Sequence, residues 1–377
     1  MEEINVCSKP KLLFLVTEDW YFVSHRLPLA VAASQAGFDV SVATRVKQHA
    51  DIIRKAGVRL IPFEMSRRAG NPFRELIGLI SLYRCERPDI VHHVALKPVL
   101  YGSISACLGG VPAQVDAVAG LGWLFISRSW LARLVSPAIR WLLARLLSAP
   151  RCRVIVQNPD DSELLRKAGV PESNLRMIRG AGVDIVAFSP GADSPEPLCV
   201  MMATRILWDK GVGEFVEAAR SLKQSGSKVR FVLVGDPDED NPASVPEATL
   251  QAWKKENVVE WLGHCDDMAA MLNTAHVVCL PSYREGLPKV LIEAAACGKP
   301  IVTTDVPGCR EVVCDGDNGF LVPVRDSKSL SEALSRLIEN PKLRTQMGKR
   351  SREIALKEFS SERVIDQTLN IYKELVE

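Results

Sequence analysis

The sequence predicts an α/β protein with two doubly wound parallel sheets, each in a domain of its own. Short apolar runs alternate with amphipathic helical segments, an order that places helices on both faces of a parallel sheet. The alternation occurs twice, and a stretch rich in proline and glycine at 189–197 separates the two series. A length of 377 residues also suits two domains better than one.

The composition indicates an ordinary folded protein and excludes several other classes. Hydrophobic residues make up 47% and charged residues 24% of the chain, which argues against disorder. The net charge of +2 gives no overall attraction to nucleic acid, and the ten cysteines contain no C-x-x-C pair for zinc. We expect no signal peptide, no simple membrane span and a cytoplasmic location with reduced thiols.

The first series of elements extends from residue 11 to about residue 190. We expect strands at 11–16, 40–43, 59–62, 89–92 and 115–118, a loop at 17–22, and helices at about 24–37 and 72–86. Ligands gather at the carboxyl ends of parallel strands. The candidate sites of this half are therefore the segments 17–22, 92–97 and 117–122.

The second series begins at residue 198. We expect strands at 198–203, 229–235, 258–263, 276–280 and 301–304, a hairpin-like strand at 318–322, and helices ending near 223 and starting near 327, 341 and 361. The acidic segment 236–241 is predicted to be a solvated loop. It contains Asp236-Pro-Asp238, which we interpret as an incidental D-x-D and not as a metal site.

A turn followed by a short apolar helix is the most informative stretch of the second half. Gly286 and Pro288 precede an apolar run at 290–296, and Gly298 ends that run. A buried strand at 276–280 leads into the turn. Strand, glycine turn and helix N-terminus together present free N–H groups and a positive dipole end, which favours an anion there.

Two glutamates flank the start of this helix. Glu285 lies just before it and Glu293 on its second turn. With a rise of about 1.5 Å per residue, roughly 7–8 Å separate Pro288 from Glu293, which suits the span from a diphosphate to its ribose. We infer that the helix start, at Gly286 and Leu287, holds a pyrophosphate. Glu293 would then hold the ribose hydroxyls, and Glu285 the group beyond the phosphates.

The glutamates and their surroundings, EGLPK and EAAACGKP, resemble the donor-site motif of the retaining glycosyltransferases of family 4. Arg205 and Lys210 match the R-x4-K-G of that family and follow a strand, where they can clamp two phosphates. The segment DIVHHVALKP resembles D-x-V-H-x-H-x-x-K-P of the capsule and lipid-linked-oligosaccharide branch, with Val94 in place of the second histidine. VTEDWYFVSHRLPLA, QNPDD, GAGVD and VPGCREVV are further matches, so the resemblance covers nearly the whole chain.

The resemblance implies the GT-B fold, in which two Rossmann-like domains face a cleft. Residues 1–190 would bind the acceptor, with a helix at about 361–377 packing back on them, and residues 198–358 would bind the nucleotide-sugar. The implied activity is retaining, metal-independent transfer of a hexose or N-acetylhexosamine, without a cofactor, to a polyprenyl-diphosphate-linked saccharide of the bacterial envelope. A UDP-sugar is favoured as donor and a GDP-sugar stays possible. The alternatives are a non-catalytic nucleotide-sugar-binding or scaffold subunit, and a sugar-nucleotide epimerase.

The resemblance also implies roles for individual residues. Glu285, Arg205 and Lys210 would be catalytic, with Glu285 binding donor-sugar hydroxyls and not acting as a nucleophile. The nucleotide would be held by Glu293, Gly286, Leu287, Arg205, Lys210 and His264, the last near the base. The acceptor side would comprise Asp19, His25, His92 and Lys97. Structural hydrogen bonding or surface exposure is the alternative for His25, His92 and His93, and no metal ligand is expected.

The segment 117–159 differs from the rest of the chain because it contains no acidic residue. Its basic residues are Arg128, Arg133, Arg140, Arg145, Arg151 and Arg153, and it also contains Trp123, Trp130 and Trp141. Basic amphipathic helices that carry tryptophan lie on anionic membranes. We therefore expect residues of about 123–153 to make the protein peripheral at the inner face of the cytoplasmic membrane. The alternative is that these helices pack inside the first domain while the arginines reach outward.

Overall fold

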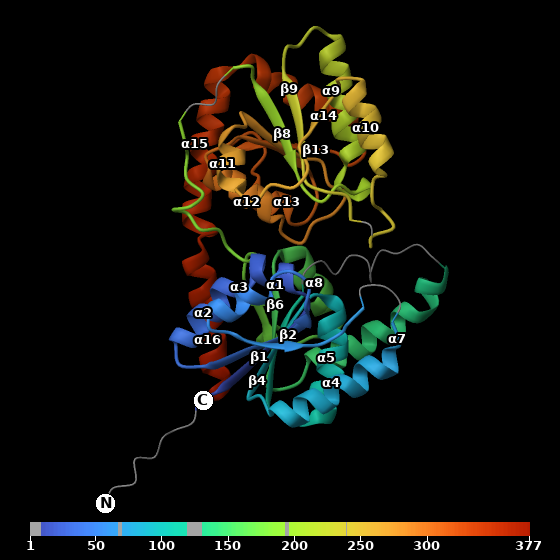
Figure 1. The fold of residues 1–377 in the computed structure, drawn as a ribbon, viewed down its shortest axis with the longest axis vertical. Helices are drawn as coiled ribbons and strands as arrows, with labels where there is room; N and C mark the ends of the chain where they lie inside the picture. Colours follow the sequence, from blue (N-terminus) through green and yellow to red (C-terminus); the bar gives the residue numbers. More distant parts are fainter. Residues whose placement is uncertain (1–8, 67–69, 119–129, 193–195, 239) are drawn as a thin grey trace, which may run out of the picture. The chain divides into compact units, whose positions relative to one another are not determined.

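The structure, a computed structural model, divides the chain into two compact units (Figure 1). It describes residues 9–66, 70–118, 130–192, 196–238 and 240–377, without side-chain detail at 130–137. Unit 1 comprises Met1–Ala181 together with Val364–Glu377, and unit 2 comprises Gly182–Arg363. The chain therefore enters unit 1 twice, at its beginning and again in its last helix.

Unit 1 is built on a seven-stranded sheet in which all paired strands are parallel. The spatial order is β3-β2-β1-β4-β5-β6-β7. The strands are β1 (Lys11–Glu18), β2 (Asp39–Arg45), β3 (Arg59–Pro62), β4 (Ile90–Val94), β5 (Ala113–Ala117), β6 (Cys152–Val156) and β7 (Leu175–Met177). The helices are α1 (Asp19–His25), α2 (Leu27–Gln35), α3 (Ala50–Lys55), α4 (Pro72–Glu86), α5 (Leu96–Gly109), α7 (Trp130–Leu147), α8 (Pro159–Lys167) and α16 (Ser361–Val376), with a 3-10 turn at Glu172–Asn174.

Alternate residues of β1 pack against different helix layers. Leu12 and Phe14 belong to a core cluster that includes residues of α2 and α16. Leu13 and Leu15 belong to another cluster, which includes residues of α4 and α5. Since successive side chains of a strand point to opposite faces, helices cover both faces of the sheet, as the sequence predicts.

Unit 2 is built on a six-stranded parallel sheet of order β10-β9-β8-β11-β12-β13. The strands are β8 (Cys199–Ala203), β9 (Arg230–Val234), β10 (Glu260–Trp261), β11 (Val277–Leu280), β12 (Ile301–Thr304) and β13 (Gly319–Val322). The helices are α9 (Val212–Gln224), α10 (Glu247–Lys255), α11 (Met268–Asn273), α12 (Lys289–Ala296), α13 (Cys309–Val312), α14 (Ser327–Glu339) and α15 (Pro341–Glu358), with a 3-10 turn at Trp208–Lys210.

Both sheets reverse their strand order at one place, between β1 and β4 and between β8 and β11. Such a switch point leaves a crevice outside the carboxyl ends of the two strands, and ligands of doubly wound sheets bind there. The fold is therefore the predicted α/β class. It also directs attention to the residues that follow β8 and β11.

Two local predictions are wrong. The segment 17–22 is not a loop, because β1 continues to Glu18 and α1 begins at Asp19. The strand at 318–322 is not part of a hairpin: β13 pairs in parallel with β12, and α13 lies between them in the chain. Antiparallel hairpins need only a tight turn, whereas parallel neighbours need a crossover, and the short α13 segment provides one. Of the candidate segment 117–122, residues 119–122 lie outside the described residues.

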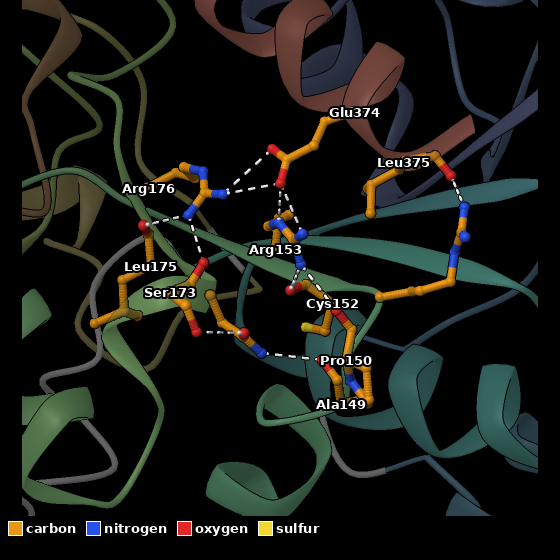
Figure 2. Close-up of polar contacts among 11 residues, drawn as sticks. Ala149, Pro150, Cys152, Arg153, Ser173, Leu175, Arg176, Glu374 and Leu375 are labelled. Carbon is orange, nitrogen blue, oxygen red and sulfur yellow. Dashed lines mark hydrogen bonds and ion pairs between the residues drawn. The ribbon is translucent and has the colours of Figure 1, made fainter. Parts of the chain in front are cut away.

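The end of α16 is attached to unit 1 by arginines (Figure 2). Arg153 Nη2 and Nε lie 2.7 and 2.9 Å from Glu374 Oε1, and Arg176 Nη2 lies 3.1 Å from the same oxygen. Arg151 donates to the carbonyl of Leu375. The hydrogen bond from Arg153 is the main cause of the lowered pKa of Glu374. Two arginines of the segment 117–159, Arg151 and Arg153, thus bind α16 within unit 1.

Candidate active site

The loops after β8 and β9 lie against each other at the carboxyl edge of the sheet. The N–H groups of Ile206 and Val245 donate to the carbonyls of Asp236 and Ile206, at 3.0 Å each. Gly235 has φ +124°, and a Cβ there would lie 2.0 Å from the Thr204 carbonyl oxygen. This close approach requires glycine at 235 and holds the loop that carries Arg205 in place.

Arg205 is paired with Asp238 across these two loops. Arg205 Nη1 lies 2.8 Å from Asp238 Oδ2, and the side chains are 43% and 13% exposed. The prediction that the acidic segment is merely a solvated loop is wrong for Asp238. Its carboxylate lies beside one of the two predicted phosphate-binding cations. The sequence signal for this contact is an acid shortly after β9, the strand next to the one that precedes Arg205.

The turn that carries Lys210 is attached to the segment that leads to Glu285. The Tyr283 N–H donates to the Asp209 carbonyl at 2.8 Å. Gly211 lies so close to Pro281 that a Cβ would meet the Pro281 carbonyl oxygen at 2.1 Å. These contacts bring Lys210 Nζ to 2.5 Å from Glu285 Oε1, a pair whose side chains are 17% and 11% exposed.

The start of α12 has the predicted strand–turn–helix geometry. β11 leads into the turn at Gly286 and Leu287, and Pro288 is the N-cap, one position outside the helix. Pro288 supplies no side-chain acceptor for the first-turn N–H groups. The loop before α13 covers the turn, since a Cβ on Gly308 would lie 2.3 Å from the Gly286 carbonyl oxygen. The positive end of the α12 dipole therefore lies beside Glu285 and Lys210.

Glu293 is buried in α12 and has a partner on its own helix. Its Oε1 lies 2.9 Å from Lys289 Nζ, one turn earlier. Burial raises the pKa of Glu293, and Lys289 opposes that rise. A carboxyl group buried beside a single cation favours hydrogen bonding to uncharged partners such as hydroxyl groups.

Tyr283 is a site residue that sequence reasoning missed. Its hydroxyl donates to Glu214 Oε1 at 2.6 Å, and the Arg325 guanidinium lies 4.7 Å from the ring centroid. Burial, followed by the bond to Glu214, raises the pKa of Tyr283 to about 12. Tyr283, two positions before Glu285, is thus held by Glu214, by Arg325 and, through its own N–H, by Asp209.

His264 is exposed on the loop after β10, and its Nε2 lies 3.2 Å from Asp266.

Asp19, predicted for the acceptor side, supports a loop of unit 1. Its side chain is 0% exposed, and its carboxylate accepts the N–H groups of Trp20, Lys47 and His49 at 2.7, 2.7 and 3.0 Å. Burial alone would raise its pKa, but these N–H groups lower it, those of His49 and Lys47 foremost. The geometry supports a positioning role for Asp19, and contact with an acceptor stays a prediction.

The two adjacent histidines of β4 lie in the core. His92 Nδ1 is 2.5 Å from the Tyr372 hydroxyl of α16, and burial holds its pKa well below the usual range. His93 bonds Asp116 at 2.7 Å and the Tyr83 hydroxyl at 3.0 Å. The structural alternative fits His93, whose two ring nitrogens are both bonded, and the role of His92 toward an acceptor stays a prediction.

His25 and Lys97 also have partners within unit 1. The His25 ring stacks on Tyr21 at 4.1 Å between centroids. Lys97 Nζ lies 2.7 Å from Glu75 and 2.6 Å from the Ser66 carbonyl oxygen. Lys97 therefore holds the segment before α4, and its role toward an acceptor stays a prediction.

The described residues contain no cluster of three or more histidine, cysteine or acidic side chains that could hold a metal ion. In the same part of the chain, no helix combines the length and the apolar character needed to cross a bilayer.

The fold is that of the GT-B glycosyltransferases. Among solved structures, the chain is similar to a sucrose-phosphate synthase from Thermosynechococcus elongatus, with a TM-score of 0.81, 21% identity, and 98% and 99% of the two chains covered. It is also similar to Anabaena Alr3699/HepE in complex with UDP, with a TM-score of 0.77, 19% identity, and 97% and 100% covered. At these identities the likeness shows the fold alone.

Family models identify the chain more closely. Residues 187–354 match the glycosyl transferases group 1, and residues 11–148 match the glycosyl transferase 4-like family. The two matches together cover most of both units, so that each half of the chain matches a glycosyltransferase family.

Curated relatives extend the similarity over nearly the whole length. The N,N'-diacetylbacillosaminyl-diphospho-undecaprenol alpha-1,3-N-acetylgalactosaminyltransferase of Campylobacter jejuni is 29% identical, over 93% of this chain and 95% of its own. The UDP-Gal:alpha-D-GlcNAc-diphosphoundecaprenol alpha-1,3-galactosyltransferase of Escherichia coli is 28% identical, over 80% of each.

Proposed function

We propose that the protein transfers a hexose or N-acetylhexosamine from a nucleotide-sugar to a polyprenyl-diphosphate-linked saccharide, with retention of the anomeric configuration. The observation that carries the proposal is the pair of Lys210 and Glu285 just before α12, with Arg205 earlier on the segment that follows β8, at the switch point of unit 2. A UDP-sugar is the favoured donor. The names of the relatives from Campylobacter jejuni and Escherichia coli support the class of acceptor.

The chemistry follows from where negative charge develops. When the bond between sugar and diphosphate breaks, the leaving diphosphate gains charge, and fixed cations and N–H dipoles lower the barrier most if they face that group. Arg205, Lys210 and the first turn of α12 supply such groups, so no metal is required for this role. Glu285 binds donor-sugar hydroxyls, and retention follows from attack on the same face as the leaving phosphate.

The acceptor side of the proposal involves the membrane surface. On α7, Trp141 is 69% exposed and Arg145 is exposed, while Leu143 and Leu147 are buried in a core cluster with Val99. A tryptophan and an arginine one turn apart suit the interface of an anionic leaflet. Trp123, Arg128 and the side chains at 130–137 lie outside the described detail, and Arg151 and Arg153 bind α16. The proposed contact therefore centres on Trp141 and Arg145, at the inner face of the cytoplasmic membrane.

A donor screen tests the function. Thermal unfolding with UDP, GDP and ADP identifies the base, and hydrolysis of the matching nucleotide-sugars identifies the sugar. Transfer to a synthetic polyprenyl-diphosphate saccharide is then followed by mass spectrometry, with and without EDTA, and NMR gives the anomeric configuration. We expect stabilisation by UDP and EDTA-resistant transfer with retention. Stabilisation by none of the three nucleotides, together with no transfer, would contradict the proposal.

A further inference from the structure

We infer that Asp238 competes inside the chain with the donor diphosphate for Arg205, and so speeds release of the nucleoside diphosphate. The inference rests on the proposed function, because it takes the diphosphate as the ligand of Arg205. It concerns a residue outside the motifs that define the donor site. The opposed charges lie 2.8 Å apart and belong to loops that follow neighbouring strands, β8 and β9.

The loop that carries Asp238 is fixed relative to Arg205. The Asp238 N–H donates to Ser244 Oγ at 3.0 Å, and the Trp208 N–H donates to the Ala243 carbonyl at 2.8 Å. Leu207 and Ser244 also form an antiparallel bridge. The first contact lies within the loop after β9, and the other two join that loop to the loop that carries Arg205. The carboxylate is therefore presented to Arg205 by backbone contacts and does not depend on a flexible side chain alone.

The two partners differ in exposure, and this difference decides which of them can turn to another ligand. The Asp238 side chain is 13% exposed and that of Arg205 is 43% exposed. The less exposed carboxylate stays where its loop holds it, while the more exposed guanidinium can turn to another anion. Contact of Arg205 with a diphosphate thus breaks the ion pair with Asp238 and brings a second negative group close to that carboxylate. Both effects lower the affinity for the diphosphate.

The competition bears more on product release than on donor choice. After transfer, the nucleoside diphosphate carries one more negative charge on its terminal phosphate than it does when esterified to the sugar. Without a competing carboxylate, a site with two cations and a helix N-terminus would hold that product tightly, and slow product release limits many enzymes. Asp238 supplies a counter-ion that takes Arg205 back as the product leaves.

Replacing Asp238 with asparagine tests the inference, because the side chain keeps its shape and loses its charge. We expect Asp238→Asn to lower the Kd for UDP about three- to tenfold by calorimetry, since it removes a competitor of Arg205. Inhibition of transfer by added UDP should strengthen by the same factor. Asp236→Asn is the matched control: it removes the same charge from the same loop, but Asp236 is exposed and forms no ion pair with Arg205.

A double-mutant cycle separates this role from simple loop support. If Asp238 acts through Arg205, Asp238→Asn should change the UDP affinity by less than twofold in an Arg205→Gln background. Far-UV circular dichroism and unfolding temperature report on folding, and Asp238→Ala replaces the asparagine variant if that variant misfolds.

The outcomes keep the two proposals apart. Failure of the unmodified protein to bind any of the nucleotides would overturn the proposed function. Binding of UDP that is unchanged or weaker in Asp238→Asn, or equally tightened in Asp236→Asn, would overturn the competition and leave the proposed function standing.

Discussion

The two units use charged residues in different ways at equivalent places. After β8 of unit 2, Arg205 and Lys210 each meet a carboxylate from another loop and keep part of their surface exposed. After β1 of unit 1, the Asp19 carboxylate is fully buried and satisfied by backbone N–H groups. A charged residue at the carboxyl end of a strand can therefore serve a ligand or support a loop. The two roles differ in how exposed the charged side chain is and in whether its partner is a side chain or the backbone. The position of the residue in the sheet does not distinguish them.

The largest effect is expected at Arg205 and Lys210, the two partly exposed cations after β8. Arg205→Ala or Lys210→Ala should lower donor turnover by about 10²-fold or more, the scale of removing one group that stabilises developing charge. Steady-state transfer assays measure this. Arg220→Ala is the control: Arg220 lies on α9 of the same unit and pairs with Glu217 and Glu256. Near-normal turnover in both site variants would remove the pyrophosphate assignment.

The buried carboxylate of unit 1 should affect stability and not the donor. Asp19→Asn should lower the free energy of unfolding by about 2 kcal/mol, because it weakens hydrogen bonds to a charged acceptor. The folded-state pKa of Asp19 lies below its usual 3.8, so this contribution is present above that pH and is lost as pH falls through the folded value. Denaturant unfolding at pH 7 and pH 3 should show the difference shrinking in acid.

The same variant sharpens the contrast between the units. The UDP affinity of Asp19→Asn should equal that of the unmodified protein, since Asp19 belongs to unit 1 and the donor residues to unit 2. A large loss of UDP affinity with unchanged stability would mean that Asp19 is not merely a support for the 45–49 segment.

The sequence carried more information about unit 2 than about unit 1, for a physical reason. The helices that begin at 327 and 341 and the turn before α12 could be predicted because glycine, proline and capping residues fix them locally. The buried networks of Asp19 and His92 could not, since their partners Lys47 and Tyr372 lie 28 and 280 residues away in the chain. The ion pair of Asp238 with Arg205 could not be predicted either, because it depends on β8 and β9 being neighbours in the sheet.

A smaller effect is expected at the outer face of α7. Trp141→Ala with Arg145→Gln should weaken binding to vesicles that contain anionic lipid by about tenfold, from the loss of roughly 1 kcal/mol of charge attraction and of apolar insertion. Arg153→Gln is the matched control, because Arg153 is tied to Glu374 and should leave vesicle binding unchanged. Co-sedimentation measures both. Equal binding to neutral and anionic vesicles would contradict a role for charge.

The smallest effect concerns the buried glutamate of α12. Because burial raises the folded-state pKa of Glu293 above its usual 4.5, ionisation opposes folding once pH passes that usual value, and the penalty is complete above the folded-state value. Glu293→Gln should therefore raise Tm at pH 7 by about 2 °C, and this gain should vanish near pH 4.

Glu293→Gln should also weaken the binding of UDP several-fold if Glu293 holds the ribose. Glu285→Gln, by contrast, should impair transfer and leave the affinity for UDP nearly intact. Equal UDP affinity in both variants would remove the division of roles along this helix.

The attachment of α16 has a consequence for synthesis. Unit 2 is one continuous stretch, Gly182–Arg363, whereas unit 1 is completed by Val364–Glu377. In that last segment Tyr372 bonds His92, and Glu374 and Leu375 accept hydrogen bonds from arginines of unit 1 (Figure 2 shows Glu374 and Leu375). Domains commonly fold as they leave the ribosome, starting from the N-terminus. Most of unit 1 is therefore synthesised first, but its sheet is completed only when Val364–Glu377 has been made. Unit 2 is synthesised later, yet its whole chain is present before that of unit 1.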